Sequence, residues 1–219
     1  MVRVLFCILC PIFFTLINGF YRPAMESYSM ALWLEDLTTF IFFPFFAFIY
    51  LVNKEQVKLK FIGFCLPKTF SGNTLSVTIE SVVVCSMIIP IFYFSVLKLS
   101  EGIIRYHWPD LYYVVSLPRL GNSWVVFSYE ILSAAIYEEL FFRSLLFYLF
   151  VDRLKSKIFV YVIASSLLFS LCHWEKGLHI VVATLFFGIM ASSFYAVYKS
   201  LVPLVTAHIL TWLLVLAAT

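Results

Sequence analysis

The chain has 219 residues, of which 63% are hydrophobic and only 12% are charged, and its mean hydropathy is +1.00. Soluble domains have about 45–50% apolar and about 25% charged residues, so this composition excludes a soluble globular domain and predicts a polytopic membrane protein. The formal net charge of +3 does not indicate nucleic-acid binding, because the basic residues are spread over short segments between apolar runs. We therefore expect a lipid bilayer, and no nucleic acid, around this chain.

Seven apolar runs approach the roughly 20 residues that a helix needs to cross a bilayer. They lie at about 4–20, 34–52, 77–97, 124–150, 158–173, 179–198 and 201–217. We predict an all-α transmembrane bundle of about seven spans, with a range of six to eight because the fourth run is long and two others are short. The longest polar connection is expected at about 98–122, and residues 1–219 are expected to form a single integral membrane domain.

The positions of Lys and Arg predict the orientation of the bundle, because cytoplasmic loops carry an excess of these residues. With a cytoplasmic N-terminus, nine of the fifteen Lys and Arg fall in cytoplasmic segments and five, including Lys176, fall in external segments. We therefore predict a cytoplasmic N-terminus and an external C-terminus.

Two glutamates and an arginine interrupt the fourth apolar run, in the segment EELFFR at positions 138–143. A charge at the bilayer centre costs roughly 2.5–3.5 kcal/mol on insertion scales, so these charges indicate a functional site. On an α-helix Glu139 and Arg143 lie about 40° apart and can pair, whereas Glu138 lies about 140° from Arg143. The spacing predicts a neutralised Glu139 and an unpaired Glu138 suited to general-base catalysis. A purely structural ion pair is the alternative.

Two histidines fall in later apolar runs. Phe169 and His173, in the segment FSLCH, share one helix face, so the phenyl ring can shield and orient the imidazole. His208 lies in the last run, PLVTAHILTW. A single histidine on an apolar face is more often a packing residue than a catalyst, but two histidines and an acid pair on three helices indicate a catalytic constellation.

The depths of these residues do not all agree. At 1.5 Å per residue, Glu138 lies roughly 20 Å and His173 roughly 23 Å from the cytoplasmic ends of their runs, but His208 lies only about 11 Å in. A tilted last helix, or a helix boundary misplaced at Lys199, would reconcile the three levels.

The motif order E-E-x-x-x-R, F-x-x-x-H and a histidine in the final helix resembles that of the CPBP (CAAX protease and bacteriocin-processing, or Abi) intramembrane endopeptidases. The type II Ras-converting CAAX prenyl endopeptidases belong to that family. The resemblance covers roughly residues 123–212, and residues 123–217 are the predicted motif-bearing catalytic helices. Gly188, Tyr195 and Pro203 also fall in place before His208, while Ser192 replaces a second glycine.

The resemblance implies a role for each motif residue. Glu138 would activate the attacking water, His173 would hold or polarise it, and His208 would help to stabilise the oxyanion. Glu139, Arg143 and Phe169 would shape the site or contact the substrate. The implied reaction is hydrolysis of a peptide bond, near the C-terminus of a membrane-associated protein or peptide, without a cofactor.

One position departs from the family pattern. The asparagine that would close the last motif is replaced by Trp212. In the family this side chain donates to the oxyanion, and losing one such donor typically lowers turnover by roughly 10²–10³. The indole N–H is itself a donor and can substitute. Trp212 as a plain interface anchor is the alternative.

Other functions stay open at this stage. Glu138, His173 and His208 could ligate Zn²⁺ with one position left for water, which would make a zinc-dependent membrane protease. The same charges could instead hold together a non-catalytic immunity or scaffold protein. Acids and histidines also form proton relays in transporters, although no inverted repeat supports that function. The short chain resembles bacterial members, so we expect a bacterial inner (plasma) membrane protein of unknown substrate.

Overall fold

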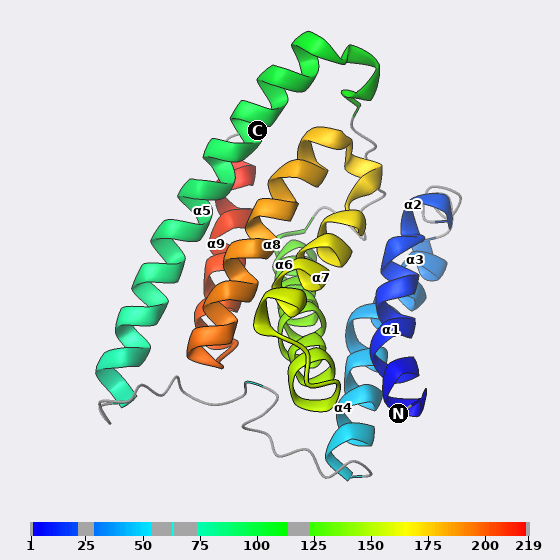
Figure 1. Ribbon diagram of the computed structural model, residues 1–219. Helices are drawn as coiled ribbons and strands as arrows, with labels where there is room; N and C mark the ends of the chain where they lie inside the picture. The colour runs from blue at the N-terminus through cyan, green and yellow to red at the C-terminus, as the bar shows by residue number, and fades with distance from the viewer. Residues whose placement is uncertain (1, 22–28, 54–62, 64–73, 114–122, 218–219) are drawn as a thin grey trace.

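The computed structural model describes residues 2–21, 29–53, 63, 74–113 and 123–217, and the elements in these ranges are all helical (Figure 1). The prediction of an all-α bundle is therefore confirmed. In the described ranges the helices form seven continuous helical segments, here called rods, at the places of the seven apolar runs. The first three rods are α1 (Val2–Leu16) with α2 (Asn18–Tyr21), α3 (Ser29–Leu37) with η2 (Thr38–Phe42) and α4 (Phe43–Asn53), and α5 (Thr74–His107).

The last four rods carry the motifs. They are α6 (Trp124–Glu138) with η5 (Glu139–Leu145) and η6 (Tyr148–Arg153), α7 (Ile158–Leu171), α8 (Leu178–Tyr198), and α9 (Val202–Ala217). Two short 3₁₀ turns, η4 (Pro109–Leu111) and η7 (Trp174–Lys176), follow α5 and α7.

Several of these helices have the length and composition of membrane spans. Within the described ranges, Met30–Asn53, Thr78–His107 and Leu178–Tyr198 are long and apolar enough to cross a bilayer, and three shorter helices are equally apolar. Large apolar side chains such as Phe6, Ile91 and Phe159 point away from the protein interior. An outward apolar surface of this kind is what lipid requires, and the chain is an integral membrane protein.

Helix α5 is longer than the sequence predicts. The expected polar connection at 98–122 is wrong over 98–107, where the helix continues to His107. The polar residues in this extension have partners, because Lys98 Nζ lies 3.1 Å from Glu101 Oε2 and Tyr112 donates a 3.0 Å hydrogen bond to Glu101. Such i,i+3 pairs support a helix beyond the hydrocarbon. Residues 114–122 of the connection lie outside the described part.

The rod that carries the EELFFR segment is not a plain α-helix. At Glu139 it changes to the π-helical segment η5, in which the backbone N–H of Leu146 reaches the carbonyl of Phe141, five residues earlier. Single π turns occur frequently at functional sites, and residue periodicity does not reveal them. The two glutamates therefore stand on either side of a change in helix geometry.

Helix α1 holds this rod in place. The hydroxyls of Thr15 and Tyr137 share a buried hydrogen bond of 2.7 Å, one residue before Glu138. The indole N–H of Trp174, in η7, donates to the carbonyl of Leu16 at 2.8 Å. The first helix thus fixes both the acid-bearing helix and the turn that follows α7.

Helices α7 and α8 approach each other closely at one glycine. A Cβ built on Gly188 would lie 2.9 Å from the backbone Cα of Ser166. Small residues at membrane helix interfaces allow such close backbone contact. Helices α7 and α8 lie beside α5 and α9 (Figure 1), and all four contribute side chains to the cavity described in the next section.

We expect Gly188→Ala to lower the free energy of unfolding by about 1–3 kcal/mol, because an overpacked helix contact forces the backbones apart. Thermal unfolding of the purified protein in detergent micelles measures the effect. The matched control is Gly102→Ala, where the new methyl group meets no atom within 4 Å. That substitution should leave stability unchanged or raise it by up to about 1 kcal/mol. Equal effects of the two substitutions would contradict the close-contact explanation.

Candidate functional site

Glu139 and Arg143 form the buried base of the site. Both side chains are 0% exposed, and Arg143 Nε lies 3.1 Å from Glu139 Oε2, in a geometry that is an ion pair rather than a linear hydrogen bond. The guanidinium also donates to Ser165 Oγ at 3.3 Å and lies over the Phe169 ring, 4.5 Å from its centroid. The predicted pairing is confirmed, although it spans a π turn rather than an α turn.

The imidazole of His208 lies between the two glutamates. Its Nδ1 is 2.8 Å from Glu139 Oε1, and its Nε2 is 3.4 Å from Glu138 Oε2. The first contact is a hydrogen bond, whereas the second is longer than a usual N–H···O distance. Within the described residues Glu138 Oε2 has no hydrogen-bond partner, so it can accept a proton or a hydrogen bond from a ligand.

Two distributions of protons leave Glu138, Glu139, Arg143 and His208 with no net charge. Buried charges are least costly when they balance. With Arg143 and Glu139 ionised, the sum is zero if Glu138 is ionised and His208 is an imidazolium, or if Glu138 is protonated and His208 is neutral. In both states Nδ1–H donates to Glu139. The two states differ only in the position of one proton between Glu138 and Nε2 of His208.

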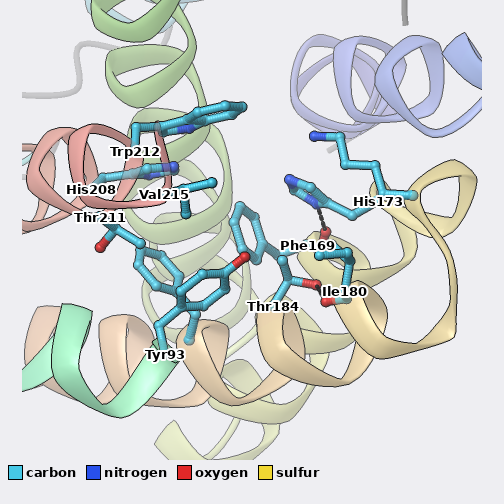
Figure 2. A pocket seen from close by; sticks show the side chains of 11 residues that line it. Tyr93, Phe169, His173, Ile180, Thr184, His208, Thr211, Trp212 and Val215 are labelled. Atoms are coloured by element: carbon cyan, nitrogen blue, oxygen red, sulfur yellow. Dashed lines mark hydrogen bonds between the residues drawn. The ribbon is translucent and has the colours of Figure 1, made fainter. Parts of the chain in front are cut away.

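His173 is oriented by its own helix. Its Nδ1 lies 2.9 Å from the carbonyl oxygen of Phe169 (Figure 2). A carbonyl oxygen only accepts, so Nδ1 carries the proton and Nε2 of the neutral ring is left as an acceptor. The sequence predicted that Phe169 shields this ring, and their centroids lie 4.9 Å apart.

Phe169 is the central side chain of the site. Its ring packs against His173, and the centroid of His208 lies 6.2 Å away on an edge-to-face contact. Figure 2 shows the phenyl ring between the two imidazoles. The ring therefore keeps the histidines apart and covers the arginine beneath them.

A cavity of about 190 Å³ opens beside the histidines. Helix α9 contributes His208, Thr211, Trp212 and Val215, and the other lining residues are Tyr93, Phe169, His173, Lys176, Ile180, Thr184 and Phe187 (Figure 2). Trp212 thus faces the site rather than serving only as an interface anchor. The Nζ atom of Lys176 lies over its ring, 5.5 Å from the centroid.

The structure explains why the depth of His208 along its helix differs from the depths of Glu138 and His173 along theirs. Helix α8 ends at Tyr198, with Lys199 as its cap, and α9 begins at Val202, so the boundary at Lys199 is correct. His208 then lies roughly 9 Å along α9, while Glu139 lies roughly 20 Å from the end of its rod at Arg153. Because the two side chains touch, α9 is displaced along the bundle relative to α6.

Seven of the eleven residues that line the cavity were not predicted from the sequence, and three of them bear on its chemistry or packing. Tyr93 comes from α5, outside the motif region, and Figure 2 shows its hydroxyl pointing toward the middle of the cavity. Phe187 packs on His208 with centroids 5.1 Å apart. Lys176 was counted only as a topology charge, although its place three residues after His173 could have drawn attention to it.

The donor set does not match a metal centre. Among the described residues no group of three or more His, Cys, Asp or Glu side chains has an arrangement that could hold a metal ion. The ring nitrogens of His208 both face carboxylates, and Nδ1 of His173 is bonded to a backbone carbonyl. Glu138, His173 and His208, which lie in the described part of the chain, are not such a group.

A protein-family model, described as type II CAAX prenyl endopeptidase Rce1-like, matches residues 120–214. Over these residues, which are less than half of the chain, the sequence is similar to the Rce1-like family. The match runs from just before α6 through most of α9 and includes all seven predicted site residues. It confirms the resemblance seen in the motifs. No curated protein and no solved structure matches the chain.

We expect Arg143→Met to lower the free energy of unfolding by about 3–5 kcal/mol, because it leaves a buried carboxylate without its cation. Unfolding of the purified variant in detergent measures the loss. Adding Glu139→Gln to the same variant removes the uncompensated charge and should restore part of the stability. If the double variant is no more stable than the single variant, charge balance is not what the pair provides.

Proposed function

We propose that this protein is an intramembrane endopeptidase that hydrolyses a peptide bond in a membrane-associated protein or peptide, close to its C-terminus. The family supports a CAAX-type protease in general terms. The observation that carries the mechanism is the carboxylate of Glu138, which is buried and lies beside His208. Its Oε2 has no hydrogen-bond partner among the residues that the structure describes. A desolvated carboxylate in such a place is suited to act as a base.

In this mechanism Glu138 takes a proton from a water molecule that also donates to Nε2 of His173. The resulting hydroxide attacks the scissile carbonyl carbon and forms a tetrahedral intermediate. Protonated Glu138 then gives its proton to the leaving amine as the carbon–nitrogen bond breaks. The carboxylate is regenerated, so no other proton donor is required.

The charge balance of the cluster supports a companion role for His208. In the arrangement with Glu138 ionised and both ring nitrogens of His208 protonated, Nε2–H of His208 is a donor beside the proposed base. The base and an oxyanion donor therefore exist in the same protonation state. A preorganised donor of this kind typically contributes roughly 10²–10³ to turnover. The indole N–H of Trp212, one turn further along α9, is a second donor that lines the cavity.

We expect Glu138→Gln to abolish peptide cleavage, with a loss of at least about 10²–10⁴, because the amide keeps the size of the side chain but cannot accept the proton. A fluorogenic peptide that carries an S-farnesyl cysteine near its C-terminus provides the assay. Mass spectrometry of protein termini in cells that express either form identifies natural substrates. The matched control is Glu80→Gln on the exposed face of α5, which should cleave normally.

Undiminished cleavage by Glu138→Gln would overturn the mechanism. If the termini in cells are unchanged while deletion still has a phenotype, the non-catalytic scaffold is the better explanation. We further propose that the reaction needs no metal. Cleavage that stops with a chelator and returns with added zinc would reverse that conclusion.

We also propose that the protein lies in a bacterial inner membrane with its N-terminus in the cytoplasm, as the excess of Lys and Arg in the corresponding segments supports. A C-terminal alkaline phosphatase fusion should then be active, because the enzyme folds only outside the cytoplasm. An inactive fusion, with an active fusion to a cytoplasmic fluorescent protein, would reverse the orientation.

A further inference from the structure

One tyrosine of the cavity takes no part in the mechanism above. Tyr93, on α5, is 9% exposed, and Figure 2 shows its hydroxyl pointing toward the middle of the cavity. Within the described residues this hydroxyl makes no hydrogen bond. A buried hydroxyl without a partner costs roughly 1–3 kcal/mol, so a ligand that accepts a hydrogen bond from it gains from the contact.

The other hydroxyls of the cavity already donate within the protein. Thr184 and Thr211 each donate at 2.8 Å to a backbone carbonyl one turn earlier in their own helix. The imidazole of His173 likewise gives its Nδ1 proton to a backbone carbonyl. In the part of the lining that the structure describes, Tyr93 is thus the only hydroxyl that can donate to a bound molecule.

Packing holds the phenol ring in its orientation. Helix α5 lies against both α8 and α9, and the ring of Tyr93 makes an edge-to-face contact with Phe187, with the centroids 6.0 Å apart. Phe187 also packs on the imidazole of His208, at 5.1 Å between centroids. One phenylalanine therefore supports both the tyrosine and the histidine. A donor held in this way is preorganised, so it needs little reorientation when a ligand arrives.

The hydroxyl also lies within the electric field of the proposed base. The charge of Glu138 acts electrostatically on Tyr93, although within the described residues no hydrogen bond joins the two side chains. Fixed donors in an apolar site are most effective where negative charge develops during a reaction, and a tyrosine hydroxyl is one of the groups that serve in this way. In the hydrolysis of a peptide bond, that charge develops on the carbonyl oxygen of the bond that breaks.

We propose that the hydroxyl of Tyr93 donates a hydrogen bond to the oxyanion of the tetrahedral intermediate. This inference rests on the proposed protease function and deepens it, because it adds a catalytic residue from α5, outside the residues 120–214 that match the family. When hydroxide adds to the carbonyl carbon, the electron pair of the carbon–oxygen double bond moves to the oxygen, which accepts from Tyr93. The tyrosine keeps its proton. The pair returns as the carbon–nitrogen bond breaks and Glu138 protonates the leaving amine.

The kinetic test is Tyr93→Phe, which removes the hydroxyl and keeps the ring that packs on Phe187. We expect kcat for the S-farnesyl peptide to fall roughly 10²- to 10³-fold, the usual effect of removing one oxyanion donor, with little change in KM. The matched control is Tyr106→Phe, which removes a hydroxyl from the same helix at a residue that is 82% exposed. Its rate of cleavage should equal that of the unmodified protein.

Two kinetic outcomes would overturn the proposal. An unchanged kcat in Tyr93→Phe would show that the hydroxyl does not meet the oxyanion. A rise in KM with kcat unchanged would place the hydroxyl on the bound substrate before reaction instead. Thermal unfolding in detergent micelles checks the fold of the variant, and the midpoint should not fall, since the hydroxyl has no hydrogen-bond partner among the described residues.

Binding separates this proposal from the protease function itself. Two dansyl-labelled peptides that cannot be cleaved carry either a phosphinate or a methylene group in place of the scissile amide, and only the phosphinate is a tetrahedral anion. Fluorescence anisotropy with Glu138→Gln, which has no carboxylate to repel the anion, should show tighter binding of the phosphinate peptide. Adding Tyr93→Phe should weaken that binding roughly 10- to 100-fold, the effect of losing one charge-assisted hydrogen bond, and should not affect the methylene peptide.

This binding result would support the tyrosine donor even if Glu138→Gln still cleaves peptides, which would refute the proposed base. Equal binding of the phosphinate peptide with and without the Tyr93 hydroxyl contradicts the donor even if cleavage depends on Glu138. An equal loss of affinity for both peptides also contradicts it, because a packing effect would act on both.

Discussion

A fully buried arginine is the constraint on which the motif-bearing half of this bundle depends. In hydrocarbon its charge must be matched nearby, and Glu139 provides the match at 3.1 Å. The aromatic rings of Phe169 and Phe187 lie against the guanidinium, at 4.5 and 5.9 Å from its central carbon. Because Glu139 also accepts from His208, the ion pair joins helices α6, α7, α8 and α9 around one charge. The position of Glu138, the proposed base, is then a consequence of its neighbour's role.

Much of this arrangement could be predicted from the sequence because charges in apolar runs are few and their spacing is informative. The seven rods, the Glu139–Arg143 pair and the Phe169–His173 contact all follow from hydropathy and from i,i+4 geometry. The contact of His208 with both glutamates did not follow, because it depends on how far α9 is displaced along the bundle. The change to a π-helix at Glu139 is also invisible in residue periodicity.

The residues that shape the cavity were the least predictable. Tyr93 and Lys176 reach it from α5 and from a three-residue turn, and neither belongs to a motif that periodicity or charge spacing identifies. Their place depends on tertiary contacts, such as the indole of Trp174 on the carbonyl of Leu16. A sequence pattern can indicate which side chains share one helix face, but not which loops fold over that face. The shape of the cavity therefore depends on the part of the molecule that sequence patterns predict least.

The hydrogen bonds from α1 to Tyr137 and Trp174 have a consequence for how such proteins can diverge. The family match begins at residue 120, whereas α1 and α5, which brace and border the site, precede it. Drift in those two helices can shift the η7 turn or reshape the cavity wall without touching an acid or a histidine. The acids and histidines therefore lie on helices that can change independently of α1 and α5. Substitutions in α1 and α5 can thus alter the cavity while the acids and histidines of the later helices stay the same.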